Sequence, residues 1–193
     1  MSYLPARSLT RRLFAVAAAA AAAGAIASPA CAASSSPAVH AAPVISACAG
    51  PTIGAWIAVS QGSEASGITY YPLEFTNAGG QTCSLSGYPV VSAISRAGVQ
   101  LGSPAGRGRL TVAPRVVLAP GATAHTTLAY HGGLVSTGGG CGPVATAFEL
   151  RIYLAGQKRA TYAAFGLQAC SHAGPVYLTI TEPVRAGIGT NQG

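Results

Sequence analysis

Residues 148–154 read Phe-Glu-Leu-Arg-Ile-Tyr-Leu, so that apolar side chains at 148, 150, 152 and 154 alternate with Glu149, Arg151 and Tyr153. Successive side chains of a β-strand point to opposite faces, and this period of two predicts a strand with one buried face. The same alternation recurs in residues 124–131 and 176–181. No segment after residue 32 combines a helical period with capping residues, so the sequence predicts an all-β fold.

Further strands are expected where β-branched and aromatic residues gather, at Ile53–Ser60, Ile68–Asn77, Val90–Ser95, Arg115–Leu118 and Ala160–Leu167. Turn residues such as Asn77-Ala78-Gly79-Gly80 and Pro120-Gly121 separate these segments. Seven to nine short strands joined by such turns predict an antiparallel, immunoglobulin-like β-sandwich. Pro72 lies inside one of them and predicts an edge strand or a bulge there.

The first 32 residues have the pattern of a signal peptide. Arg7, Arg11 and Arg12 precede an Ala-rich apolar run, and Ala30-Cys31-Ala32 supplies the small residues of a cleavage site. The adjacent arginines fit a twin-arginine signal and equally an ordinary secretory signal, and both stay open. We therefore expect a secreted or extracytoplasmic protein, with lipid anchoring through Cys31 as the less favoured alternative because the preceding residues make a poor lipobox.

The remaining chain divides by composition into three parts. Residues 33–47 are small, uncharged and contain proline, which predicts a flexible tether. Residues 48–185 form the expected β-sandwich domain, and residues 186–193 are expected to be a disordered tail. No segment after the signal peptide is long and apolar enough to predict a transmembrane helix.

Cleavage after Ala32 leaves four cysteines, and an even number outside the cytoplasmic membrane predicts two disulfides. A hairpin formed by the first two expected strands places Cys48 opposite about residue 80, close to Cys83. A hairpin that turns near residue 157 places Cys141 opposite about residue 173, close to Cys170. Of the three possible pairings, these distances favour Cys48–Cys83 and Cys141–Cys170.

One motif points to a family. Asn-x(5)-Cys-x-Leu-x-Gly-Tyr-Pro begins at Asn77 and ends at Pro89, and Leu118-x-Pro-Gly and two later cysteines follow it. From about Cys48 to Pro183 the chain resembles the exported actinobacterial domain-of-unknown-function family four-two-three-two. The resemblance implies a secreted or envelope-attached β-sandwich of unassigned function and brings no catalytic residues with it.

The Gly87-Tyr88-Pro89 part of the motif has a structural interpretation. Proline restricts the backbone, glycine permits a left-handed turn, and a tyrosine can close the end of a sandwich while its hydroxyl bonds to a backbone carbonyl. The alternative is that Tyr88 faces a ligand.

Charged side chains are scarce, at 8% of the residues, and the four acidic residues are all glutamates. With no Asp and no Gly-x-Ser-x-Gly motif, a Ser-His-acid hydrolase is not indicated. His125 and His131 share a strand face but lie about 20 Å apart, too far for one metal ion. We expect no catalytic residues, no cofactor, no metal and, for lack of a basic-aromatic patch, no nucleic acid.

The sequence therefore predicts an exported, non-enzymatic binding or structural domain whose partner is an unknown component of the cell envelope or the exterior. One alternative is a secreted hydrolase that uses Glu74 or Glu149 with a histidine, and another is an extracellular carrier of a small ligand. A cleft that joins a histidine to a glutamate favours the hydrolase. An exposed patch of Trp56, Tyr70 or Tyr71 favours binding.

Three arginines are the candidate contact for such a partner. Removing the signal peptide leaves eight basic and four acidic residues, a net charge of 8 − 4 = +4. Arg107, Arg109 and Arg115 fall in Gly102–Arg115, whose poor alternation and glycine and proline content predict a long exposed loop. Guanidinium groups suit phosphate or carboxylate, so an anionic wall polymer or lipid headgroup is the expected contact, against the alternative of a merely solvated loop.

Overall fold

Two hydrogen-bonded sheets carry the long strands of the computed structural model, which describes residues 44–137 and 140–190. The expected signal peptide and residues 33–43 of the expected tether lie outside the described residues. In chain order the strands are β1 (Ile53–Ile57), β2 (Ser63–Ala65), β3 (Ile68–Asn77), β4 (Cys83–Leu85), β5 (Val90–Ile94), β6 (Gln100–Leu101), β7 (Gly106–Arg107), β8 (Val116–Leu118), β9 (Thr123–Tyr130), β10 (Val144–Tyr153), β11 (Thr161–Cys170), β12 (Leu178–Ile180) and β13 (Arg185–Ala186). Helical turns are η1 (Gly50–Thr52), η2 (Val59–Gln61) and α1 (Gly132–Ser136).

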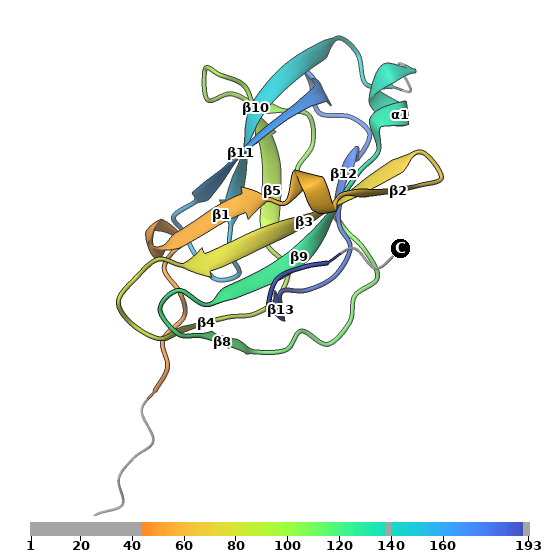
Figure 1. Ribbon diagram of the computed structural model, residues 1–193. Coiled ribbons are helices and arrows are strands. Elements are labelled where there is room, and N and C mark those ends of the chain that lie inside the picture. The colour runs from red at the N-terminus through yellow and green to blue at the C-terminus, as the bar shows by residue number, and fades with distance from the viewer. Residues whose placement is uncertain (1–43, 138–139, 191–193) are drawn as a thin grey trace, which may run out of the picture. The chain divides into compact units, whose positions relative to one another are not determined.

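The first sheet has the strand order β1-β3-β9-β12-β7, with β2 added to β3 and β13 added to β9. The second has the order β11-β10-β5-β6, and β4 and β8 form a small third sheet at the lower end of the domain (Figure 1). All strand pairs are antiparallel except β12 with β7. The domain is thus mostly β with several antiparallel sheets, as the alternating sequence predicts.

The described residues contain thirteen strands, more than the expected seven to nine. The additional ones, among them β2, β4, β6, β7 and β13, are two or three residues long. A strand of this length is too short to show an alternating pattern, and pairing with a longer neighbour defines it. The sequence therefore predicts the longer strands and, of the short ones, only β8 and β12, which lie in apolar or alternating segments.

One apolar side chain of residues 148–154 faces away from the core. Phe148 was expected on the buried face of its strand, but it is 42% exposed. The register between β10 and β11 shifts between Ala147 and Glu149, which marks a β-bulge. Because of the extra residue, Ala147 and Leu150 face the core while Phe148 lies outside, with the Arg96 guanidinium 4.4 Å above its ring.

The strand expected at Ile53–Ser60 ends at Ile57, where η2 begins two residues later. β3 is therefore flanked on one side by β1 and then by β2. Pro72 lies in the gap between the registers of these two partners, where no partner strand needs its missing N–H. The expectation of an edge strand or a bulge at Pro72 is wrong with respect to β9, which pairs with β3 on the other side without a register shift.

Both large sheets contribute to one hydrophobic core. Leu73 and Phe75 of β3 belong to the same fully buried cluster as Leu150 and Ile152 of β10. Tyr177 is also fully buried, and its hydroxyl donates a 2.8 Å hydrogen bond to the carbonyl of Leu101 in the second sheet. Tyr177 directly precedes β12 of the first sheet, so this bond joins the two sheets through the core.

The structure contains the disulfides Cys48–Cys83 and Cys141–Cys170, the pairings that the hairpin distances favoured. The second closes the β10–β11 hairpin just beyond the Val144–Cys170 pair. The first forms differently from the expectation, because Ala47 pairs with Ser84 in parallel instead of continuing an antiparallel hairpin.

Both ends of the domain are more ordered than their composition predicts. Residues 45–47, assigned to the flexible tether, bond to β4 and to Arg115. Ala186, assigned to the disordered tail, belongs to β13, and Gly187 and Gly189 bond to β9 and β3. Backbone hydrogen bonds order these segments, and composition does not reveal such bonds.

Tyr177→Phe removes the hydroxyl that joins the two sheets and leaves a buried carbonyl without this donor. Burial raises the pKa of Tyr177 to about 12, so the hydroxyl stays a donor at physiological pH. We expect the free energy of unfolding in urea to fall by about 1–3 kcal/mol. Tyr162→Phe, at a position 52% exposed on β11, is the control and should change it little. Equal stability of the two variants would contradict a structural role for the Tyr177 hydroxyl.

Candidate functional site

The side chain of Asn77, at the end of β3, holds together the turns at the lower end of the domain. Its amide nitrogen donates to the carbonyl of Gln81 at 2.8 Å and to that of Leu118 at 3.0 Å, and its oxygen accepts from the Gly79 N–H at 3.0 Å. Its backbone bonds to Gly121 and Ala122 in the turn before β9. Asn77 is 1% exposed, so these bonds satisfy a buried polar group that joins two turns.

The motif that follows Asn77 continues this framework. Cys83 pairs with Leu118 and Leu85 with Val116 in the β4–β8 sheet. Gly87 has a φ of +78°, a conformation that favours glycine, and directs Tyr88 into a position only 8% exposed.

Tyr88 fixes the backbone of the loop that carries the candidate arginines. Its hydroxyl donates to the carbonyl of Arg109 at 2.9 Å and accepts from the N–H of Thr111 at 3.2 Å. The structural interpretation of Tyr88 therefore agrees with its hydrogen bonds. The motif supports a surface loop from beneath.

Residues 107–115, here called the basic segment, lie partly in a strand. Arg107 belongs to β7, which pairs with β12, while Arg109 and Arg115 lie on the connection to β8. All three side chains are exposed. Arg115 donates a hydrogen bond to the carbonyl of Ile45, where the described chain begins, and borders a pocket of about 270 Å³.

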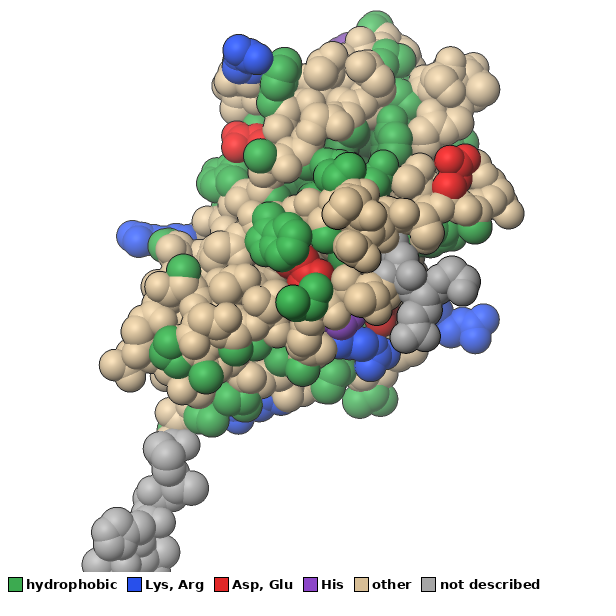
Figure 2. Space-filling model, in the orientation of Figure 1, with side chains coloured by type: hydrophobic (Ala, Val, Ile, Leu, Met, Phe, Trp, Pro, Cys, Tyr) green, Lys and Arg blue, Asp and Glu red, His purple; other side chains and the backbone are tan. Residues whose placement is uncertain are grey.

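No carboxylate neutralises the basic segment within the described part of the chain. The one ion pair of the described residues joins Arg185 to Glu182 at 2.7 Å, outside this segment. Figure 2 shows Lys and Arg side chains along the lower and right edges of the view, where β13 and the connection from β7 to β8 run, and also at its left and upper left. Among the described residues, none of the three arginines takes part in an ion pair.

Glu74 and His125, which the hydrolase alternative needs, lie directly opposite each other on β3 and β9. The C-terminal segment covers them: the Gly189 N–H donates to Glu74 Oε1 at 2.8 Å, and His125 Nδ1 lies 2.8 Å from the Gly187 carbonyl. Glu74 is fully buried, and its Oε2 has no hydrogen-bond partner among the described residues. A Cβ at Gly189 would lie 2.9 Å from the His125 ring and from Pro72, so the segment packs closely.

This cover leaves Glu74 without access to substrate. Burial raises the pKa of the Glu74 carboxyl, while the Gly189 bond and the charge of His125 act in the opposite direction. The arrangement resembles a buried structural carboxyl more than a catalytic one.

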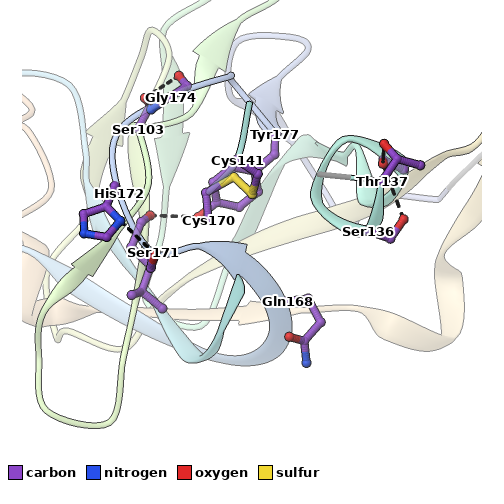
Figure 3. The surroundings of a disulfide bond; sticks show 12 residues. Ser103, Ser136, Thr137, Cys141, Gln168, Cys170, Ser171, His172, Gly174 and Tyr177 are labelled. Atoms are coloured by element: carbon purple, nitrogen blue, oxygen red, sulfur yellow. Dashed lines mark hydrogen bonds between the residues drawn. A yellow bond between two sulfur atoms is a disulfide. The ribbon is translucent and has the colours of Figure 1, made fainter. Parts of the chain in front are cut away.

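The remaining candidate groups do not assemble into a catalytic set. Glu182 accepts from Thr127 and Arg185, and Glu64 and Glu149 lie apart on β2 and β10. Figure 3 shows Ser171 and His172 beside the Cys141–Cys170 disulfide, with Ser171 Oγ 3.0 Å from His172 Nδ1. No carboxylate orients this histidine, and the described residues contain no group of three or more His, Cys, Asp or Glu side chains suited to a metal.

The aromatic residues named for a binding patch differ in exposure, since Tyr70 and Tyr71 of β3 are half-buried. Trp56 is 45% exposed on β1, whereas Tyr71 packs edge-on against Phe165 with 5.0 Å between the ring centroids. No helix in the described ranges is long and apolar enough to cross a membrane.

Residues 48–182 match the family described as Domain of unknown function (DUF4232). The chain belongs to this family. The resemblance inferred from the motif at Cys83–Pro89 is thereby confirmed for the family, and the match covers β1 to β12 of the DUF4232 domain. No curated protein matches the chain.

The sequence of this DUF4232 domain predicted its three arginines as a candidate anion contact, but it did not reveal two features of the structure around them. The role of Asn77 as a buried hydrogen-bond centre was not inferred, although asparagine before a Gly-Gly turn is a recognised signal. The covering of Glu74 was also missed, because residues 187–189 carry no pattern that predicts contact with β3.

Asn77→Ala should lower the free energy of unfolding by about 3 kcal/mol, because it leaves two carbonyls and one N–H without their partner. Asn77→Asp should destabilise as well, since an oxygen would then face two carbonyls. Gln81→Ala is the matched control, because its exposed side chain is removed while its carbonyl remains. Urea denaturation measures all three, and an Asn77→Ala variant as stable as the control would refute the role of Asn77.

Glu74→Gln tests the buried carboxyl through pH. With a folded-state pKa above the ordinary 4.5, Glu74 contributes stability that is present below pH 4.5 and lost as pH rises through the folded-state pKa. A glutamine stays neutral and keeps an oxygen for the Gly189 N–H. We expect the unfolding free energy of Glu74→Gln to fall less than that of the wild type from pH 4.5 to about pH 7. Glu149→Gln removes the same charge at a more exposed position and should follow the wild-type profile, as measured by urea titrations at stepped pH.

Proposed function

We propose that this protein is an exported, non-enzymatic domain that binds an anionic component of the cell envelope through Arg107, Arg109 and Arg115. The observation that carries the proposal is a backbone-anchored segment with three exposed guanidinium groups and no carboxylate in contact with them. Guanidinium groups bind phosphate and carboxylate in planar, charge-assisted geometry. An anchored loop loses little conformational entropy on binding.

Export is supported by the two disulfides, which persist in oxidising compartments and are rare in the cytosol. It is supported equally by the signal-peptide pattern of residues 1–32. An extracytoplasmic location also suits the proposed ligand, since wall polymers and membrane headgroups carry phosphate.

The internal hydrogen bonds of the glutamates favour a binding role over hydrolysis. Two of the four, Glu74 and Glu182, are engaged in internal hydrogen bonds, and Glu74 is sealed from solvent. A hydrolase that used Glu74 would require the C-terminal segment to leave this residue before a substrate could reach it, and Glu149, the other candidate, lies apart from it on β10.

We further propose an immunoglobulin-like arrangement that accounts for the basic segment. The strand orders β1-β3-β9 and β11-β10-β5-β6 correspond to A-B-E and G-F-C-C′ of that fold. The place of strand D, beside E, is taken by β12, which follows G. Between C′ and E, β7 and β8 still pair with other strands, and the chain that joins them, residues 108–115, carries Arg109 and Arg115 next to Arg107 of β7.

The test measures binding of the folded mature domain to a soluble anionic polymer, either polyphosphate or a glycerol-phosphate polymer of the teichoic type. Binding should weaken steeply with salt, because exposed charges are screened beyond about 8 Å at physiological ionic strength. The variant Arg107→Gln/Arg109→Gln/Arg115→Gln should lose binding and keep its melting temperature.

The matched control, Arg96→Gln/Lys158→Gln/Arg159→Gln, removes the same charge elsewhere and should retain most of the binding. Equal binding by the first variant and the wild type would show that the basic segment is only a connector. Equal loss in both variants would show that net charge alone is responsible.

A further inference from the structure

The basic segment carries apolar side chains that an anion-binding loop does not need. Leu110 is 73% exposed and Val112 is 95% exposed, and both lie between Arg109 and Arg115. Val44, at the start of the described chain, is 92% exposed. These are the three most exposed large hydrophobic residues of the described ranges, although they come from segments more than sixty positions apart.

Hydrogen bonds and strand pairing bring these residues to one end of the domain. The Arg115 side chain bonds to Ile45, the neighbour of Val44. Ala47 pairs with β4, β4 pairs with β8, and Tyr88 holds the backbone of Arg109. Figure 2 shows hydrophobic side chains gathered along the lower edge of the view, over β4 and β8.

We propose that this end, formed by residues 44–47 and 107–117, docks on the surface of a bilayer that contains anionic lipid. The arginines would bind lipid phosphates while Leu110, Val112 and Val44 enter the boundary between headgroups and acyl chains. The inference rests on the proposed function and adds the identity of the anion. A soluble polymer would satisfy the arginines but would leave the apolar side chains in water.

The path of the chain supports this orientation. The 43 residues that precede Val44 join the domain at this same end. A segment that enters the membrane during export, as a signal peptide does, therefore brings this end of the domain to the bilayer. The nearby acidic group, Glu182, is neutralised by Arg185 and does not oppose an anionic surface.

The first experiment compares binding to vesicles of phosphatidylglycerol and phosphatidylcholine with binding to soluble polyphosphate. The wild type should cosediment with anionic vesicles and not with pure phosphatidylcholine vesicles. Leu110→Ser/Val112→Ser should weaken vesicle binding on the order of tenfold, because two apolar side chains are lost, and should leave polyphosphate binding unchanged. Val99→Ser, at a position 60% exposed in the β5–β6 turn, is the control.

A second experiment places a fluorescent probe in the loop. Trp56 is the one tryptophan of the chain, so a Trp56→Phe/Leu110→Trp variant reports on position 110 alone. Its emission should shift to the blue with anionic vesicles, whereas Trp56→Phe/Val99→Trp should show no shift. Melting temperatures of all variants confirm that they fold.

The outcomes separate the two proposals. If the Leu110→Ser/Val112→Ser variant binds vesicles as the wild type does and the probe at 110 does not shift, the lipid inference is overturned while anion binding stands. If the triple arginine variant still binds polyphosphate as the wild type does, the proposed function itself fails.

Discussion

The buried amide of Asn77 is the constraint on which the lower end of the domain depends. A polar side chain at 1% exposure must find all its partners inside the protein, and Asn77 finds them in the backbone of two separate turns. Because those partners are backbone groups, the path of the chain is specified whatever side chains the turns carry. Cys83 then joins this end covalently to Cys48, and Tyr88 extends the framework to the basic segment.

Because acidic residues are scarce, few carboxylates are left to pair with the arginines that this framework presents. One glutamate is sealed beneath the C-terminal segment and another is paired with Arg185. Three of the eight basic residues that follow residue 32 lie on the basic segment, and no carboxylate of the described residues forms an ion pair with them. In a domain with more surface acids, the same three arginines would be engaged in weak ion pairs and would present little positive potential.

The long strands could be predicted because their alternation is imposed by burial on one face. β3 begins and ends at the expected residues, Ile68 and Asn77. Both disulfide pairs were predicted from hairpin spacing, although only Cys141–Cys170 closes a hairpin directly, because Ala47 pairs with Ser84 in parallel beside Cys48–Cys83. Phe148 was misplaced because a bulge inserts one residue without changing the apolar pattern, and Ala186 was misplaced because a two-residue strand depends on its neighbour.

The sequence by itself determined the all-β class, the disulfide pairs, the family and the identity of the candidate arginines, since these rest on local periodicity, cysteine spacing and a contiguous motif. Tertiary structure alone decided that Val44 and Leu110 share one end of the domain, that β12 stands beside β9, and that Glu74 lies beneath Gly189. Each of these contacts joins segments more than forty residues apart. Such contacts follow from the packing of the sheets around a common core, which no local pattern encodes.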